Sequence, residues 1–265
     1  MVGSRSKKVA RRTQNAQVSK ALLGDFYPED AHAYRVDRHS FTIFVGGDPA
    51  HAGVMENVGA EPGVEHNMAD RFEINLNMLS GIDSEKPILI NLSSCGGNWE
   101  HGMKMFGAIL YCPNPVTVLA TYDARSMTSL IPLAADRFLI RPPAQYMFHQ
   151  GTFGFEGTVA EAITAGGELA KSSEMMLRIY IARLKSQGMY KSRPEAEIRK
   201  ILIDHMKDHV DVWLSADDAL RWGFADATFE GNLKTLRATK VNSERRKMMS
   251  TVIRKKLRVE APRVF

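Results

Sequence analysis

Short, almost entirely apolar runs alternate with longer segments of helical periodicity through the middle of this chain, and this alternation constrains the fold most. The clearest runs are residues 88–92 and 115–120. Each has the length of a strand, and continuous apolar character is typical of strands that are buried on both faces. Parallel strands of this kind need a crossover connection, usually a helix, between them. The alternation therefore predicts an α/β fold with a mostly parallel sheet covered by helices.

Further elements follow the same order. Residues 53–66 are rich in Gly, Glu and Asn and are expected to form a loop. Ser215 and Gly223 are typical residues for the start and the end of a helix. We also expect strands at 40–45, 137–141 and 146–148, and helices at 68–79, 102–110, 127–135 and, the longest, 158–185.

Composition limits the class of protein further. The 265 residues, of which 44% are hydrophobic and 25% charged, are enough for one sizeable core. The two cysteines, Cys95 and Cys112, cannot form a disulfide framework, which favours a reducing compartment. No secretory apolar stretch follows the basic start, and no run approaches the roughly 18 apolar residues of a membrane span. We therefore expect a soluble, cytoplasmic protein without a membrane partner.

Positive charge is concentrated at the two ends of the chain. Residues 1–20 hold six Lys or Arg and no acid, and residues 234–265 hold eleven against two acids, so the segment between them is net acidic although the whole chain is +5. We divide the chain into a basic N-terminal extension (1–39), a body (40–231) and a basic C-terminal tail (232–265). Because the body lacks a basic face, nucleic acid is not expected as the main partner. The ends could instead be solvated arms that contact a partner or a neighbouring subunit.

Gly96 and Gly97 follow the first apolar strand and precede a helix. Glycine lets the backbone turn sharply there and leaves N–H groups free to hold an anion or an oxyanion. The alternative is an ordinary strand-to-helix turn. A phosphate loop is excluded because its Lys-Ser/Thr ending is missing.

Ser126 stands between the strand at 115–120 and an apolar helix. A serine at a helix start lies near free backbone N–H groups and the positive end of the helix dipole, which suits a nucleophile that must form an oxyanion. The alternative is a helix N-cap. Spacing alone does not choose Ser126 over Thr128 or Ser129.

Histidines supply two further candidates. His149 stands where the strand at 146–148 opens into a glycine-containing loop, and it could act as a general base or lie at the margin of the core. His205 and His209 would share one helix face, as zinc ligands often do, but no Glu stands in the H-E-x-x-H position and no third ligand is evident. We interpret these two as part of a solvated helix face and expect no metal.

Taken in order, these segments resemble the Clp protease proteolytic subunit family. Each motif is weak alone, but their order and local context together make a strong case. Residues 91–97 resemble the family's Asn-Ser-Pro-Gly-Gly turn, 122–128 its Gly-Gln-Ala-Ala-Ser-Met-Gly segment, 147–150 its Met-Ile-His-Gln segment, 211–216 its Asp followed by aromatic-Leu-Ser/Thr-Ala, and 222–226 its closing Tyr-Gly-Leu-Val-Asp.

The resemblance implies a serine endopeptidase that works by acyl transfer. By this likeness Ser126 is the nucleophile, His149 the general base, and Asp211 the group that orients the histidine and stabilises its charged form. No cofactor is implied.

The resemblance also implies how substrate is held. The oxyanion hole would consist of the backbone N–H groups of Gly96 and Met127. An unfolded polypeptide would lie as an added strand beside Gly97, Gly151 and Thr152. Such pairing reads the backbone more than side chains, so broad sequence specificity is expected.

For the fold, the resemblance implies a crotonase-like α/β sheet with flanking helices and one long protruding helix at 158–185. Family members form stacked rings that interlock through this helix and enclose the active sites, so a homo-oligomer is expected. An AAA+ unfoldase ATPase would deliver polypeptide substrates, since this chain has no nucleotide motif of its own.

The chain departs from the family pattern at the site itself. Arg125 replaces a small residue next to the nucleophile and raises the question of how freely substrate reaches it. Thr128 replaces a glycine, and Cys95 replaces the usual proline. Additional chain near 189–199 makes Asp208 an alternative third member of the triad.

Other functions remain open at this point. One is a non-catalytic ring or scaffold subunit of the same family. Another is a hydratase-type acyl-CoA enzyme, which shares the fold and holds a thioester oxyanion with paired N–H groups. A third is a maturation protease of related fold that works without an ATPase.

Overall fold

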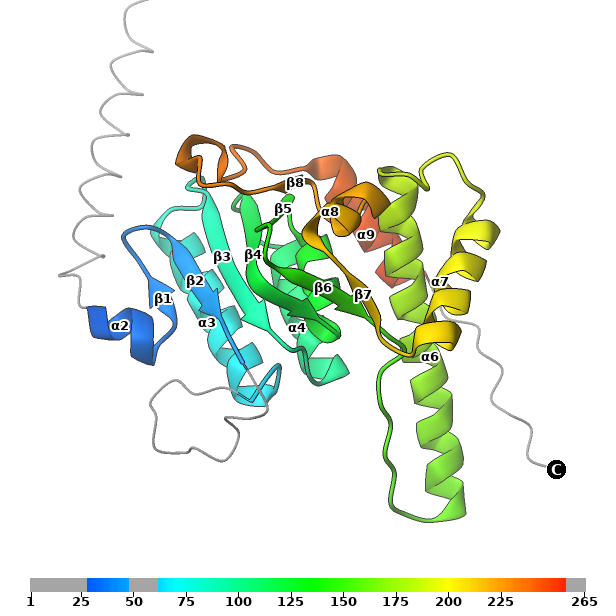
Figure 1. Ribbon diagram of the computed structural model, residues 1–265. Helices are drawn as coiled ribbons and strands as arrows, with labels where there is room; N and C mark the ends of the chain where they lie inside the picture. Colours follow the sequence, from blue (N-terminus) through cyan, green and yellow to red (C-terminus); the bar gives the residue numbers. More distant parts are fainter. Residues whose placement is uncertain (1–27, 48–61, 256–265) are drawn as a thin grey trace, which may run out of the picture.

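A sheet of eight strands forms the centre of the structure, a computed structural model in which residues 28–47 and 62–255 are described (Figure 1). The strand order is β1-β2-β3-β4-β5-β8, and β6 pairs with both β4 and β7. All pairs are parallel except β1 with β2 and β6 with β7, which confirms the predicted mostly parallel sheet. The strands are β1 Val36–Asp37, β2 Thr42–Val45, β3 Ile88–Ser94, β4 Val116–Arg125, β5 Arg137–Ile140, β6 Gln145–Phe148, β7 Val212–Leu214 and β8 Ala227–Thr228.

Helices cover the sheet and extend beyond it. In Figure 1, α3 and α4 lie behind strands β2 to β4, while α6 runs past the lower edge of the sheet. The helices are α2 Pro28–Ala33, α3 His66–Ile82, α4 Trp99–Leu110, α5 Met127–Leu130, α6 Val159–Ser186, α7 Glu195–His209, α8 Ala216–Trp222 and α9 Ser243–Arg254, with short 3-10 turns η2 Ile131–Ala134 and η3 Leu233–Thr235.

Two apolar layers explain the uninterrupted apolar runs of the sequence. Alternate residues of a strand point to opposite faces. The larger layer contains Ile88, Ile90 and Val118 together with the inner sides of the helices. The smaller layer, on the opposite face, consists of Leu89, Leu119, Leu139, Phe229 and Leu236.

Most predicted elements agree with the structure within a few residues. Strand β4 is longer than the predicted 115–120 because it changes partner, pairing with β5 as far as Ala120 and with β6 from Asp123. The helix predicted at 127–135 is instead α5 followed by η2, since Pro132 has no N–H to continue an α-helix. Most of the loop predicted at 53–66 lies outside the described residues.

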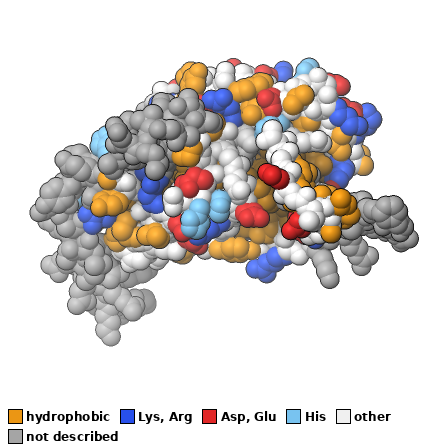
Figure 2. All heavy atoms as spheres, turned by 90° about the horizontal axis from the view of Figure 1, so that it is seen from below, with side chains coloured by type: hydrophobic (Ala, Val, Ile, Leu, Met, Phe, Trp, Pro, Cys, Tyr) orange, Lys and Arg blue, Asp and Glu red, His pale blue; other side chains and the backbone are white. Residues whose placement is uncertain are grey.

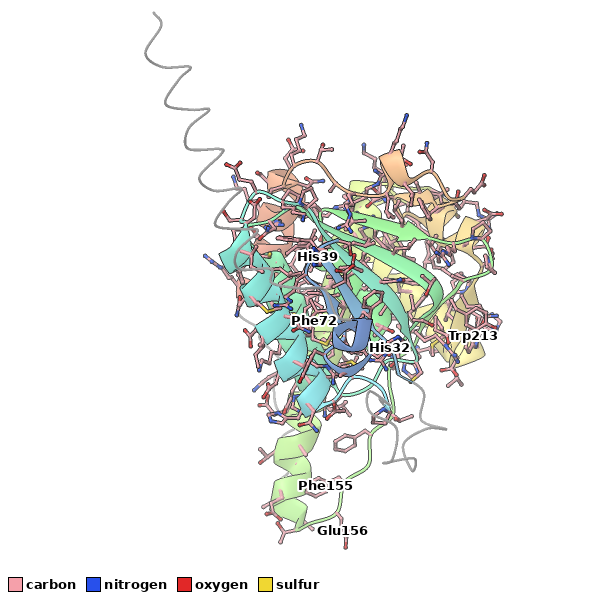
Figure 3. All side chains as sticks on the ribbon, turned by 90° about the vertical axis from the view of Figure 1, so that its left-hand side faces the viewer. His32, His39, Phe72, Phe155, Glu156 and Trp213 are labelled. Atoms are coloured by element: carbon pink, nitrogen blue, oxygen red, sulfur yellow. The ribbon has the colours of Figure 1, made fainter. Side chains whose placement is uncertain are left out.

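Helix α6 begins with a capping box and projects away from the sheet. The Thr158 hydroxyl accepts a hydrogen bond from the Glu161 backbone, and the Glu161 carboxylate accepts one from the Thr158 backbone. Phe155, on the segment that leads into α6, stacks with Phe153 and lies on the projecting part in Figure 3. The first turns of α6 are mostly exposed. Among the described helices, none combines the length and the apolar character that crossing a membrane requires.

The basic C-terminal segment is built into the fold as far as it is described. Arg237 donates hydrogen bonds to the carbonyls of Ser40, Phe41 and Pro87. Arg245 of α9 is paired with Asp226, which also receives the fully buried Arg183. Burial opposes ionisation of Asp226, but Arg245 and Arg183 outweigh it and hold the pKa of this carboxyl well below its usual value. Most of the predicted N-terminal extension (1–39), and residues 256–265, lie outside the described residues.

Candidate active site

Ser126 occupies a sharp turn between β4 and α5. Its backbone has φ 51° and ψ −123°, an unusual conformation for a residue other than glycine. Its N–H still donates to Met147 O at 2.9 Å, so the turn begins within the sheet. The Ser126 side chain makes no capping hydrogen bond to α5. The N-cap interpretation is therefore not supported, and the hydroxyl is available for another partner.

The two neighbouring hydroxyls are engaged elsewhere. Thr128 is buried, and its Oγ1 donates to Ser94 O at 2.7 Å while accepting from Arg125 N at 3.0 Å. Ser129 is also buried, and its Oγ donates to Ser126 O at 2.6 Å. These bonds hold the turn together. Of the three hydroxyls, the Ser126 hydroxyl is the one that meets a histidine.

His149 joins Ser126 to Asp211. Its Nε2 lies 2.7 Å from Ser126 Oγ, and its Nδ1 lies 2.9 Å from Asp211 Oδ1. The antiparallel pairing of β6 and β7 explains the second contact. Phe148 is paired with Val212, so His149, directly after β6, and Asp211, directly before β7, lie side by side. A neutral imidazole that donates from Nδ1 to the carboxylate can accept the Ser126 proton at Nε2.

A tight turn places Asp211 at the start of β7. Val210 has φ 59° and ψ −66°, and Asp211 N donates to His209 O at 2.6 Å, which together describe a γ-turn. The Asp211 side chain remains 43% exposed, against 18% for His149. The alternative residue, Asp208, lies exposed within the last turn of α7. Of the two aspartates, the structure brings Asp211 to His149.

Gly96 packs directly against the serine turn. A Cβ at this position would lie 2.6 Å from Ser126 Cβ and 2.8 Å from Met127 N, and the backbone has φ +95°. Only glycine fits such a close approach without strain. Met127 is the first residue of α5, where N–H groups have no intrahelical acceptor. The turn therefore brings the backbone of Gly96 beside that of Met127.

The neighbouring backbone leaves edges on which an extended chain could pair. Val64 forms a parallel bridge with Gly97, donating to Gly96 O at 2.7 Å and accepting from Asn98 N at 2.8 Å. In this pattern the N–H and C=O of Gly97 point away from Val64. On the other side of the site, Gly151 and Thr152 follow His149 and are exposed.

These residues lie together at the carboxyl ends of β3, β4 and β6, where α/β sheets usually bind ligands. Figure 2 views the molecule from the end toward which these strands run. The rings of His205 and His209 stack at 6.0 Å, and His205 also packs against Trp222, so this helix face is not simply solvated as predicted. With Asp211 these two histidines line one cavity, so the face adjoins the site. Within residues 28–47 and 62–255, no group of three His, Cys, Asp or Glu side chains is placed to hold a metal.

The sequence did not predict where the Arg125 side chain lies. It forms an ion pair with Asp123 and places its guanidinium over the ring of Trp213. Arg125 directly precedes Ser126, and Trp213 lies two residues after Asp211. This proximity in sequence to the site residues was a sign that both side chains lie near the site. Only the strand register of the structure shows that they meet.

Comparison with known proteins identifies a family. The family model described as Clp protease matches residues 56–232. The ATP-dependent Clp protease proteolytic subunit of Streptococcus mutans is 26% identical over 172 residues, 64% of this chain and 82% of that protein. The subunit of the same name from Deinococcus radiodurans is 25% identical over 169 residues, 63% of this chain and 76% of that protein.

A solved structure shows the same fold. A point variant of a ClpP subunit from Listeria monocytogenes superposes with a TM-score of 0.56 and 22% sequence identity, covering 74% of this chain and 94% of that one. The likeness agrees with the predicted crotonase-like fold.

We predict that Gly96→Ala destabilises the protein by about 1–3 kcal/mol, because the new Cβ overlaps the serine turn and the positive φ disfavours alanine. Thermal and urea unfolding measure the effect. The control is Gly107→Ala in α4, where nothing lies within 4 Å of the added Cβ; removing a helical glycine there should be neutral or stabilising by roughly 0.5–1 kcal/mol. Equal stability of the two variants would contradict the close packing of Gly96.

Proposed function

The chain belongs to the Clp protease family, and we propose that it is a serine endopeptidase subunit that cleaves unfolded polypeptides inside an oligomeric chamber. Membership of this family supports peptidase activity in general. The observation that carries the finer proposal is the continuous hydrogen-bonded chain from Ser126 through His149 to Asp211. This is the arrangement that acyl transfer by a serine needs.

In the proposed mechanism, Ser126 Oγ attacks the peptide carbonyl while His149 Nε2 takes the hydroxyl proton. The Asp211 carboxylate holds the imidazole tautomer and stabilises the imidazolium that forms. His149 then returns the proton to the leaving amine, and an acyl-serine remains. Water, activated by the same histidine, hydrolyses this ester and releases the second product.

The negative oxygen of the tetrahedral intermediate would be held by the backbone N–H groups of Gly96 and Met127. The close approach of the glycine turn to the start of α5 supports this assignment of the two N–H groups. A preorganised donor of this kind is typically worth about 10²–10³ in rate. Backbone donors suit an enzyme that must accept many substrates.

Substrate would bind as an extended strand between two backbone edges. One edge is the outward N–H and C=O of Gly97, and the other is the exposed segment at Gly151 and Thr152. Pairing through the main chain gives affinity without selecting side chains. This favours unfolded polypeptides as the substrate class, because the backbone of a folded protein is not free to pair as an extended strand.

The proposal extends to assembly and partners. The projecting, mostly exposed part of α6 supports homo-oligomeric rings that interlock through this helix. The relatives named above are ATP-dependent proteolytic subunits, and for this chain we propose an AAA+ unfoldase as the partner that hydrolyses ATP. The catalytic step itself uses no cofactor.

We predict that Ser126→Ala reduces cleavage of casein by at least about 10³-fold, because the nucleophile is lost. The measurement is peptide release by the purified full chain, with Ser250→Ala on α9 as a remote serine control. A serine-directed phosphonate should label wild-type protein at Ser126. Undiminished casein cleavage by Ser126→Ala would overturn the assignment of Ser126 as the nucleophile, and an unlabelled, inactive, pure oligomer would favour a scaffold subunit.

The two aspartates give a matched pair of variants. Asp211→Asn should lower kcat by roughly 10²–10⁴-fold, since the amide no longer fixes the productive tautomer of His149. Asp208→Asn should change kcat by less than about 2-fold, because Asp208 is exposed on α7. Steady-state kinetics with a fluorogenic peptide compare the two. The reverse order would assign the triad to Asp208.

The unfoldase partnership predicts a difference between substrates. The purified chain should cleave casein without ATP, because casein is already unfolded. A stably folded test protein should be degraded only when a purified AAA+ unfoldase of the Clp type and ATP are both added. Loss of the folded substrate is followed by gel and by fluorescence. Degradation of the folded protein by this chain alone would instead favour a maturation protease that needs no ATPase.

A further inference from the structure

Arg125 and Trp213 meet across the strand that leads to His149. Strand register places Arg125 opposite Met147 on β6, and Met147 opposite Trp213 on β7. Residues paired in this way point to the same face of a sheet. The guanidinium carbon of Arg125 lies 5.4 Å from the centre of the Trp213 ring, so its side chain reaches across the middle strand.

Asp123 fixes the orientation of this guanidinium. Its Oδ2 accepts a hydrogen bond of 2.6 Å from Arg125 Nη2. The two side chains are 29% and 14% exposed, for Arg125 and Asp123 respectively. Because they stand two apart on β4, they lie on one face. A pair that is this far removed from solvent holds the long side chain more firmly than an exposed surface pair does.

Strand β7 is held by the core on one face only. It is only three residues long, and among the described strands it pairs with β6 alone. Val212 and Leu214 face the core, whereas Trp213 points to the opposite face and is 47% exposed. Trp213 lies at the margin of the molecule in Figure 3. The contact with Arg125 therefore ties the outer face of this edge strand to β4.

The position of β7 in turn sets the position of Asp211. Asp211 immediately precedes Val212, so its backbone moves with the strand. Its side chain is 43% exposed, and water can compete for the hydrogen bond with His149. The 2.9 Å contact between the two side chains thus depends on how the strand is held.

We propose that Arg125, acting through Trp213, is a positioning residue that keeps the Asp211 carboxylate on His149. The catalytic consequence rests on the function proposed above, while the geometry does not. In this role Arg125 is a support for the triad and does not act as an obstacle to substrate.

The first test is Arg125→Met in the full chain. We expect kcat for a fluorogenic peptide to fall about 10-fold with KM unchanged within about 2-fold, because a positioning loss acts on the transition state. In an Asp211→Asn background, Arg125→Met should have no further effect, since both changes remove the same interaction. The control is Arg254→Met, which breaks a similar arginine–aromatic contact with Tyr111 at 6.0 Å, far from the site. A rise in KM alone, or an undiminished effect in the Asp211→Asn background, would overturn the proposal in favour of substrate contact.

Thermal unfolding checks that Arg125→Met folds. Variants of the Trp213 ring provide a second test that does not depend on that variant. Trp213→Leu should lower kcat as Arg125→Met does, and Trp213→Phe, which keeps an aromatic face, should restore most of it. Equal activity of Trp213→Leu and wild type would contradict the proposal.

A third measurement separates this inference from the proposed function. The downfield Nδ1 proton resonance of His149, assigned by its absence in His149→Ala, should weaken in Trp213→Leu and persist in Trp213→Phe. An unchanged resonance in Trp213→Leu overturns the positioning role and leaves the function standing. Failure of the phosphonate to label wild-type Ser126, with the resonance behaving as expected, overturns the function and leaves the positioning role standing.

Discussion

The change of partner along β4 is the constraint on which the candidate site depends. From Ala120 to Ala124, β4 advances by four residues, while its partner β3 advances by only two, from Leu92 to Ser94. This bulge lets β4 leave β5 and take β6 as its neighbour. Bulges re-aim the strand that contains them. The end of β4, which leads to Ser126, is thereby turned toward β6, the strand that His149 follows.

Two strained residues mark the same region. Ser126 and Val210 both have positive φ although neither is glycine. Such conformations cost on the order of 1–3 kcal/mol each and persist only where the surroundings fix them. At Ser126 the buried hydrogen bonds of Thr128 and Ser129 do so. At Val210 the end of α7 and the pairing of β7 define the turn from both sides. At both residues the surrounding structure therefore overrides the local preference of the backbone for negative φ.

The sequence predicted the elements better than the contacts between them. Apolar runs and helical spacing reveal which residues are buried, so the strands and long helices could be located. The choice between Asp208 and Asp211 could not be made from spacing, because it depends on the pairing of Phe148 with Val212. The charge of Arg245 likewise suggested a solvated arm, because a charge count does not reveal a half-buried carboxylate such as Asp226 as its partner.

Because Asp211 is partly exposed, the orientation of its carboxylate depends more on the position of its backbone than on burial. The orienting aspartate of the best-known serine triads is buried, so the surrounding protein excludes water from it. Here 43% of the side chain is accessible. Water can then offer the carboxylate alternative hydrogen bonds, and its orientation depends on the γ-turn before it and the strand after it. A guanidinium laid across β6 onto Trp213 restrains that strand from the side that the core does not reach, which gives a physical reason for an arginine at position 125.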